Sequence, residues 1–330
     1  MSKRKTDHIQ MAALSVPATS NSDNRFYYEP LLSAHPSNHP SIDFLGKTMR
    51  FPLWISSMTG GSDEAKRINH MLAEACAEFG LGMGLGSCRS LLNSDQYIDD
   101  FDLRNIIGNE LPLYANLGIA QIEKLIESGQ TDRIHHVVSK LKADGLIIHV
   151  NPTQEWLQPE GDLFKKPAIE TITKLIDNVN GDYNIIVKEV GQGMGPESLK
   201  ALLKLKIDAI EFGAFGGTNF ASIEIMRNTK GHAPFMLPLA TFGHTANEML
   251  ETINSIKLNE KIHCSRLIIS GGIKNFLDGY YFIKKSAVPS LYGMAGIVLQ
   301  HALSSKTDLY DFLKAEYEGY KYASSFLTIK

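Results

Sequence analysis

The stretch DGLIIHVNPTQEWLQPEGD, residues 144–162, joins a short apolar run to a cluster of polar side chains. The run is apolar on successive positions, which is typical of a parallel strand that is covered on both faces. His149 and Asn151 stand two residues apart at its end, so their side chains share a face while the strand continues. The sequence therefore predicts a buried strand that presents polar chemistry at its carboxyl end.

Seven further apolar runs of this kind occur along the chain, separated by segments with helical periodicity. Alternating strands and helices predict a parallel sheet. Eight such units in about 250 residues match an α/β fold of the (β/α)8 TIM barrel type better than an open doubly wound sheet. The predicted strands are PLWISSM (52–58), LGMGLGS (81–87), LPLYANLG (111–118), DGLIIHV (144–150), NIIVKEV (184–190), DAIEFGA (208–214), RLIISGG (266–272) and LYGMAGI (291–297).

The segments between these runs carry apolar stripes at the three-to-four-residue spacing of a helix. In the segment after residue 61, Ser62 is a suitable N-cap, and Asp63 and Glu64 are well placed in the first turn. The glycine-rich GLGMGLGS (80–87) lies within a predicted strand, so we do not interpret it as a dinucleotide-binding loop. The stripes are Ala65, Ile68, Leu72, Ala75, Cys76 and Phe79; Ile134, Val137, Val138 and Leu141; and Leu199, Leu202 and Leu203.

The expected organisation is a single domain. Residues 16–45 are rich in Pro, Ser and Asn, so residues 1–45 are expected to be an irregular N-terminal extension lying partly over the active site. Residues 46–330 would form the barrel with C-terminal helices. The basic start MSKRKTDHIQ precedes an apolar run that is too short and too interrupted for a signal peptide or membrane span.

Composition narrows the class of protein further. The chain has 33 basic and 36 acidic residues and a formal net charge of −3, which offers no general attraction for nucleic acid or an anionic membrane. Any bound anion must therefore be held locally. Cys76, Cys88 and Cys264 are widely separated and lack CxxC spacing, which argues against disulfides and zinc and favours a cytoplasmic protein.

The active site of such a barrel lies at the carboxyl ends of its strands. Gln154 and Glu155 follow His149 and Asn151 at that rim. Each alone is more simply a polar loop residue, but four together favour a binding site. Lys188 ends another apolar run, and its burial is costly unless an anion or several acceptors lie beside it. Because the adjacent glutamate faces the opposite side of the strand, a ligand anion is the favoured partner.

Three glycine-bearing turns supply backbone N–H groups: FGGT (215–218), SGGIK (270–274) and GMAG (293–296). Each is singly a tight turn, but the last two occupy the usual phosphate site of these barrels. They predict a phosphate-bearing cofactor.

A second anion site is suggested by GSCRS (86–90), which contains Ser87 and Arg89, and by the basic tail. The simpler interpretation of the tail is a solvated end, unless it folds over the barrel mouth. Cys88 has a cationic neighbour that would lower a thiol pKa. No partner base is identifiable, so we interpret it as a bystander to the chemistry.

With these motifs the chain resembles type 2 isopentenyl diphosphate isomerase, the FMN-dependent form. The similarity covers nearly the whole chain, and the segment HVNPTQEWLQPEGD is its most specific element. The matching motifs are RKTDH (4–8), SSMTGG (56–61), GSCRS (86–90), YANLG (114–118), HVNPTQEWLQPEGD (149–162), VKEVGQG (187–193), GAFGGTNF (213–220), SGGIKNFLDG (270–279) and GMAG (293–296).

The resemblance implies interconversion of isopentenyl and dimethylallyl diphosphate in isoprenoid biosynthesis, by a 1,3-allylic proton shift without net redox change. Reduced FMN would be the acid and base, and NADPH would serve only to reduce it. Glu155 would help to hold Mg²⁺. The implied FMN contacts are Ser57, Met58, Thr59, Ser87, Asn116, Lys188 and Thr218, with the phosphate at Gly271, Gly272, Ile273, Lys274, Ala295 and Gly296. The implied substrate contacts are Arg4, Lys5, His8, Ser87, Cys88, Arg89, His149, Asn151 and Gln154.

Two residues depart from the family pattern: Lys274 stands where arginine is usual, which weakens bidentate phosphate recognition, and Phe220 where tryptophan is common. The main alternative is an FMN-dependent oxidoreductase of the 2-hydroxy acid oxidase type. That enzyme would need a histidine base and an arginine clamp late in the barrel, and LIISGGIK supplies neither. A non-catalytic FMN-binding or assembly protein would leave the polar rim unused. A homo-oligomer, tetrameric or octameric, is expected.

Overall fold

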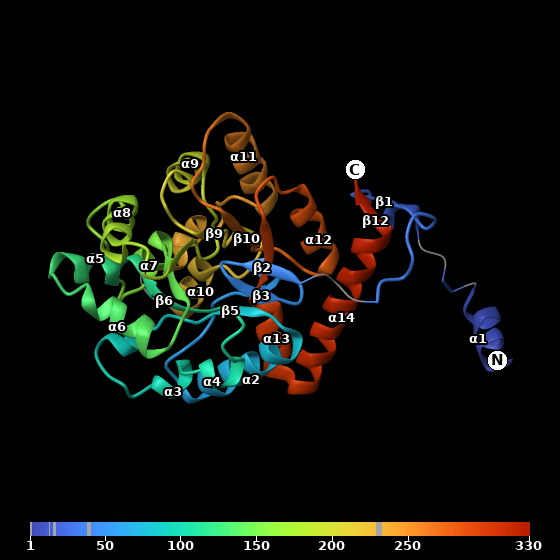
Figure 1. Cartoon of the computed structure of the whole chain (residues 1–330), viewed down its shortest axis with the longest axis horizontal. Helices are drawn as coiled ribbons and strands as arrows, with labels where there is room; N and C mark the ends of the chain where they lie inside the picture. The colour runs from blue at the N-terminus through green and yellow to red at the C-terminus, as the bar shows by residue number, and fades with distance from the viewer. Residues whose placement is uncertain (1, 13, 16–17, 38–40, 229–232) are drawn as a thin grey trace.

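Eight parallel strands close into a barrel in the computed structural model, which describes residues 2–12, 14–15, 18–37, 41–228 and 233–330 (Figure 1). Seven of the eight strands fall within a predicted apolar run and β11 begins one residue before its run, so the predicted (β/α)8 fold is confirmed. The order around the barrel is β10-β11-β4-β5-β6-β7-β8-β9. The strands are β4 (Leu53–Ile55), β5 (Gly82–Gly84), β6 (Leu113–Gly118), β7 (Gly145–His149), β8 (Asn184–Lys188), β9 (Ala209–Glu211), β10 (Arg266–Ser270) and β11 (Ser290–Met294).

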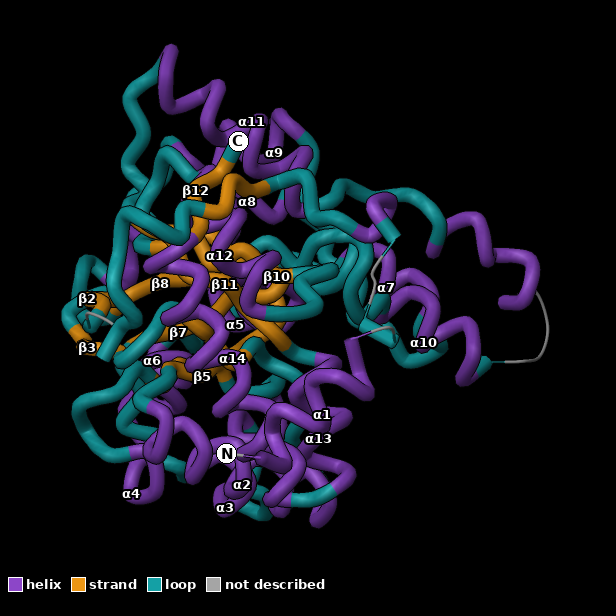
Figure 2. The backbone as a smooth tube through the Cα atoms, turned by 90° about the vertical axis from the view of Figure 1, so that its right-hand side faces the viewer, coloured by secondary structure: helices purple, strands orange, loops and turns teal. Residues whose placement is uncertain are grey.

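Helices surround these strands, as the tube in Figure 2 shows. In helix α2 (Asp63–Phe79) the Ser62 hydroxyl accepts from the Ala65 N–H at 3.2 Å, and Gly80 ends the helix at φ 68°. The predicted cap and stripe are confirmed there. The helices are α2 (Asp63–Phe79), α3 (Ile98–Phe101), α4 (Arg104–Ile107), α5 (Ile119–Glu127), α6 (Asp132–Lys140), α7 (Pro152–Leu157), α8 (Ala168–Val179), α9 (Pro196–Leu203), α10 (Phe220–Arg227), α11 (Ala246–Asn259), α12 (Phe276–Lys285), α13 (Gly296–Ser304) and α14 (Lys306–Phe326), with 3-10 turns η1 (Thr19–Asn21), η2 (Arg89–Leu92) and η3 (Ala233–Ala240).

A hairpin of β2 (Ile42–Phe44) and β3 (Lys47–Met49) closes the amino end of the barrel. Its two-residue turn has positive φ at Leu45 (53°) and Gly46 (85°), as a tight hairpin requires. Phe44 and Met49 are buried among the innermost side chains of the strands, and the Phe44 ring lies 5.4 Å from the Trp54 ring. The expected boundary at 45/46 therefore falls inside one folded hairpin. With this end filled, chemistry is confined to the other.

The lead-in expected to be irregular also contains regular structure. Strand β1 (Phe26–Tyr28) pairs antiparallel with β12 (Leu327–Ile329) at the other end of the chain. Arg25 reinforces this attachment, since its guanidinium contacts Asp23 at 2.6 Å and Asp278 at 2.8 Å. The pairing partner is some 300 residues away in sequence, so no local pattern predicts it.

Helix α1 (Ser2–Ala12) lies beyond α14, away from the barrel (Figure 1). Arg4, Lys5 and His8 are exposed on it, and the apolar side chain of Ile9 is 79% exposed. The structure thus does not place this segment over the barrel mouth as expected, because it buries too little apolar surface to be fixed there.

Within the described residues, none of the helices combines the length and hydrophobicity that a membrane span needs.

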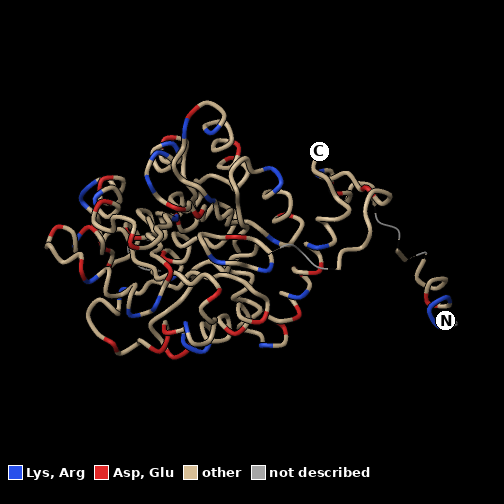
Figure 3. Tube along the Cα trace, viewed as in Figure 1, with Lys and Arg blue, Asp and Glu red and all other residues tan. Residues whose placement is uncertain are grey.

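Lys and Arg are interspersed with Asp and Glu along the outer helices in the view of Figure 3. This agrees with the small net charge of −3 and with the expectation that anions are bound locally.

Candidate active site

Two adjoining cavities, of about 280 and 110 Å³, lie at the carboxyl ends of the strands. They share Ser57, Met58, Lys188, Val190 and Phe220. Of the predicted residues, those that line one or both are Ser57, Met58, Ser87, Asn116, His149, Gln154, Lys188, Thr218, Gly271, Gly272, Ile273, Lys274, Ala295 and Gly296.

One end of the larger cavity is formed by glycine backbone. Gly216, Gly271 and Gly272 have φ of 110°, 93° and 77°, which disfavour any other residue. A Cβ on Gly271 would lie 2.2 Å from the Ala214 carbonyl oxygen, and one on Gly217 only 3.0 Å from the Gly271 Cα. The two loops therefore pack backbone against backbone, which leaves main-chain atoms to contact a ligand.

Helix α13 begins at this same end of the cavity. Its N-cap, Ala295, makes no side-chain capping bond, so its first N–H groups remain available for an anion. Helix α12 is different, because the Asn275 side chain already accepts from the Leu277 and Asp278 N–H groups. The Lys274 N–H donates to Asp278 at 2.9 Å. The amino end of α13, rather than that of α12, is therefore suited to a phosphate.

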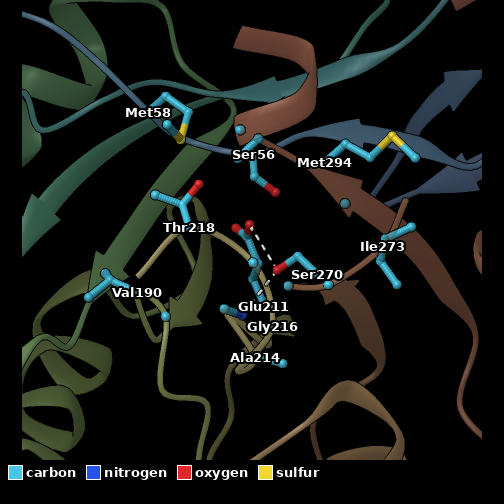
Figure 4. Close-up of a pocket in the computed structure, with 18 of the residues that line it drawn as sticks. Ser56, Met58, Val190, Glu211, Ala214, Gly216, Thr218, Ser270, Ile273 and Met294 are labelled. Carbon is cyan, nitrogen blue, oxygen red and sulfur yellow. Dashed lines mark hydrogen bonds between the residues drawn. The ribbon is translucent and has the colours of Figure 1, made fainter. Parts of the chain in front are cut away.

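Glu211 lines the larger cavity together with the glycine loops and Lys188, and the close-up in Figure 4 shows it beside Ser270, with Gly216 and Ser56 near it. Its side chain is 0% exposed, and one carboxylate oxygen accepts from the Ser270 hydroxyl at 3.5 Å. The other oxygen has no partner among the described residues, nor do the hydroxyls of Ser56 and Ser57. Glu211 is not among the predicted site residues, although its signal, a charge ending an apolar run, is the one that singled out Lys188.

Lys188 is 6% exposed, and its ammonium donates to the Glu189 carbonyl at 2.9 Å. It forms no ion pair within the part of the chain that the structure describes. The Glu189 carboxylate instead accepts from the N–H groups of residues 191–193, at 2.6 to 2.9 Å, and burial is the main reason that its pKa is raised. The prediction that these neighbours do not pair is confirmed.

The rim of the smaller cavity contains a neutral histidine. His149 Nδ1 lies 2.8 Å from the Asn116 side-chain oxygen, while the Asn116 amide group donates to the Leu85 carbonyl. Nδ1 therefore carries the proton and Nε2 is an acceptor. Burial, and secondly the charge of Lys188, lower the pKa of His149 to about 3.

A chain of amides and carboxylates lies behind this rim. The Asn151 amide group donates to Gln154 and to Glu155, both at 3.0 Å, and Gln154 donates to Glu224 at 3.3 Å. Because carboxylates only accept, Glu155 and Glu224 fix which way both amides point. The buried Asn151 side-chain oxygen is left without a partner among the described residues. Glu224, on α10, was not predicted either; α10 lies beside α7 (Figure 2).

Asp162 connects the rim to the second predicted anion site. Its N–H donates to the Glu155 carboxylate at 2.6 Å, and its own carboxylate contacts Arg89 at 2.8 Å. It also accepts from Lys124 and Gln121, and the Lys124 bond is the main reason that its pKa is lowered.

The remaining predicted residues do not line either cavity. Arg89, 55% exposed, is held by Asp162, and Thr59 contributes only its close backbone approach to Gly86. The thiol of Cys88 is buried in the core, and burial raises its pKa to about 12, so a contact between Cys88 and a substrate would involve its main chain. Among the described residues, no group of three or more His, Cys, Asp or Glu could hold a metal.

A scan against models of protein families finds no match. Several curated proteins are nevertheless similar in sequence. The isopentenyl-diphosphate delta-isomerase of Rickettsia felis is 32% identical over 311 residues, covering 92% of this chain and 86% of that protein. The Rickettsia peacockii protein of the same name is 30% identical over 328 residues, covering 97% and 91%.

Solved structures with the same fold share much less sequence. A mandelate oxidase variant with 2-hydroxy-phenylacetamide superposes with a TM-score of 0.61 at 13% identity, covering 93% of this chain and 86% of that one. A flavocytochrome b2 variant with benzoylformate gives 0.62 at 13% identity, covering 91% and 71%. These likenesses show the barrel fold alone, whereas the sequence relatives, matched over almost their whole length, show that the chain belongs to the isopentenyl-diphosphate delta-isomerase family.

Proposed function

We propose that the protein is an FMN-dependent isomerase that interconverts isopentenyl and dimethylallyl diphosphate in isoprenoid biosynthesis. One observation carries the proposal: a glycine-lined end, a buried Lys188 and the His149–Gln154 rim share two adjoining cavities. A solved neighbour on this barrel, mandelate oxidase, is described with an FMN adduct. The name of the sequence relatives suggests the reaction, and the FMN adduct of this neighbour on the same fold suggests the cofactor.

The cavities fit FMN in their chemistry. The loops at Gly271 and Gly296 offer backbone donors to a phosphate, and unpartnered buried oxygens of Ser57 and Glu211 offer partners to the rest of the molecule. Of the proposed FMN contacts, Thr59 alone lies outside the cavity walls, and its carbonyl accepts from the Asn69 side chain.

The reaction adds a proton to one alkene carbon and removes one from an allylic carbon. Bound FMN, once reduced by NADPH, would supply the acid and base groups. Lys188 would stabilise negative charge beside its ammonium. Neutral His149 would offer Nε2 as an acceptor, and Gln154 would be held in one orientation by Glu224.

The rim also suits a metal-bound diphosphate. Glu155 is buried and each of its oxygens accepts one hydrogen bond, which leaves lone pairs for Mg²⁺, and the Asn151 oxygen is unpartnered. One carboxylate, an amide oxygen, diphosphate oxygens and water form a common Mg²⁺ environment. Ser87 and Arg89 would contact the diphosphate from the facing loop.

The basic tail remains a proposal that requires rearrangement. Arg4, Lys5 and His8 would reach the substrate only if α1 moved to the barrel mouth or if a second copy supplied it. Assembly as a tetramer or octamer, and a cytoplasmic location, are likewise proposed.

An anaerobic assay with FMN, NADPH, Mg²⁺ and isopentenyl diphosphate is expected to yield dimethylallyl diphosphate without consuming NADPH beyond the amount that reduces the FMN. The oxidase alternative predicts instead that lactate reduces the flavin and that no allylic product forms. It is disfavoured because His149 on β7 is the only histidine, and no arginine is found, among the described residues that line the cavities.

Replacing Asp162 by asparagine is expected to raise the KM for isopentenyl diphosphate roughly fivefold, because Arg89 loses the carboxylate that holds it. FMN affinity should not change. Lys124→Met is the matched control, since Lys124 contacts the same carboxylate from the outer surface. An equal rise in KM for that control would mean that Asp162 acts through local stability and not through Arg89.

A further inference from the structure

The carboxylate of Glu211 has no assigned role and is unusual for a fully buried group. It projects into the larger cavity, its side chain is 0% exposed, and one of its oxygens has no partner among the residues that the structure describes. A buried, half-satisfied carboxylate is costly in a folded protein. The arrangement is therefore best explained by a ligand that donates to it.

Lys188, the cationic side chain on the neighbouring strand, does not pair with the Glu211 carboxylate. Lys188 and Glu211 are register partners on the neighbouring parallel strands β8 and β9, so both side chains point into the barrel. They nevertheless form no ion pair, and the Lys188 ammonium donates to the Glu189 carbonyl instead. The two buried charges thus face one cavity separately, and each is available to a different part of a ligand.

The position of Glu211 indicates which part of the ligand it meets. The glycine end, with the amino end of α13, suits the phosphate, and the walls shared with the smaller cavity, including Met58 and Lys188, suit the ring. Glu211 lines only the larger cavity, and in the view of Figure 4 it stands between Met58 on one side and Gly216 on the other. In FMN, a hydroxyl-bearing chain connects phosphate and ring.

The chemistry of the donors agrees with this assignment. Hydroxyl groups donate well to a carboxylate, and such charge-assisted bonds are stronger than neutral ones. A metal ion is a poorer candidate, because the described residues contain no second carboxylate, histidine or cysteine grouped with Glu211 for that purpose. The Ser56 hydroxyl, also buried and unpartnered, lines the same cavity and can bind the same chain.

We propose that Glu211 forms a polyol subsite, in which its carboxylate accepts hydrogen bonds from the ribityl hydroxyls of FMN. This inference rests on the proposed FMN dependence. It assigns Glu211 to cofactor recognition and not to proton transfer.

The test is titration of FMN into the apoprotein, followed by flavin fluorescence, for the wild type, Glu211→Gln and Glu211→Leu. FMN affinity is expected to fall on the order of tenfold for glutamine and further for leucine. Repeating the titration with 2′-, 3′- and 4′-deoxy-FMN should abolish the difference between wild type and variants for whichever hydroxyl Glu211 binds. A loss of equal size for FMN and all three analogues would overturn the proposal.

Thermal unfolding of the apoprotein separates this role from a structural one. Because the unpartnered carboxylate is unfavourable, both variants should have a Tm equal to or above that of the wild type. Glu123→Gln is the matched control: Glu123 is buried outside both cavities and accepts from the Lys165 and Lys166 N–H groups, so its Tm should fall while FMN affinity holds. A drop in Tm for the Glu211 variants like that of the control would contradict the inference.

Failure of the inference is distinguishable from failure of the proposed function. If wild-type protein does not bind FMN, the cofactor proposal itself is wrong. If it binds FMN and the variants bind equally well, only the role of Glu211 is wrong.

Discussion

Replacing Lys188 by methionine is expected to lower kcat/KM by on the order of a hundredfold, because it removes the buried positive charge on which the cavities depend. Methionine has a similar unbranched length, so the packing of β8 should persist. The apoprotein should be at least as stable as the wild type, since Lys188 is 6% exposed and forms no ion pair among the described residues.

The pKa of His149 gives a measure of the lost Lys188 charge that does not depend on activity. Lys188 is the second cause, after burial, of the low pKa of His149, which is about 3. Removing a nearby cation favours protonation, so the pKa of His149 should rise in Lys188→Met, while burial keeps it below the ordinary value. An NMR titration of the imidazole signals measures this shift. The reduction potential of bound FMN should also become more negative.

Lys204→Met serves as the control, because Lys204 pairs with Glu260 on the outer surface. It should change neither kcat/KM nor the His149 titration. If Lys188→Met leaves both the reduction potential and the pKa of His149 unchanged, Lys188 does not face the cofactor and the site is wrongly placed.

The barrel was predictable because parallel strands covered on both faces appear as unbroken apolar runs in the sequence. Glu211 carries the signal that singled out Lys188, a charge within an apolar run, but the sequence DAIEFGA does not show that it ends β9 and faces the cavity. Its importance depends on what surrounds it: an unpartnered oxygen is visible only once the neighbouring strands are placed.

Long-range pairing set the other limit of sequence-based prediction. Strand β1 pairs with β12 near the other end of the chain, and the hairpin β2–β3 packs on the barrel core. Each of these three strands has only three residues, so little local pattern marks it. Cys88 shows a local limit of the same kind, because it precedes exposed Arg89 while its thiol is buried in the core. Adjacent residues in a loop share a sequence motif without sharing an environment.

Replacing Glu155 by glutamine is expected to lower activity on the order of a hundredfold at low Mg²⁺, with partial recovery as Mg²⁺ is raised and with FMN affinity unchanged. Both carboxylate oxygens now accept from N–H donors, Asn151 at 3.0 Å and Asp162 at 2.6 Å. A glutamine must turn its own N–H₂ toward one of these donors, so it loses a hydrogen bond as well as the negative charge.

Glu160→Gln is the matched control, because Glu160 lies on the same loop with its side chain 63% exposed and pairs with Arg227 on the surface. That variant should retain wild-type activity and Mg²⁺ dependence, which steady-state assays over a range of Mg²⁺ concentrations would measure. The Mg²⁺ dependence separates two roles that a buried carboxylate held by two donors can have: holding the metal or fixing the loop. If it holds the metal, added Mg²⁺ compensates by mass action for the weakened site. If it only fixes the loop, activity stays low at every Mg²⁺ concentration, and a concurrent loss of FMN would show that Glu155 supports the cofactor instead.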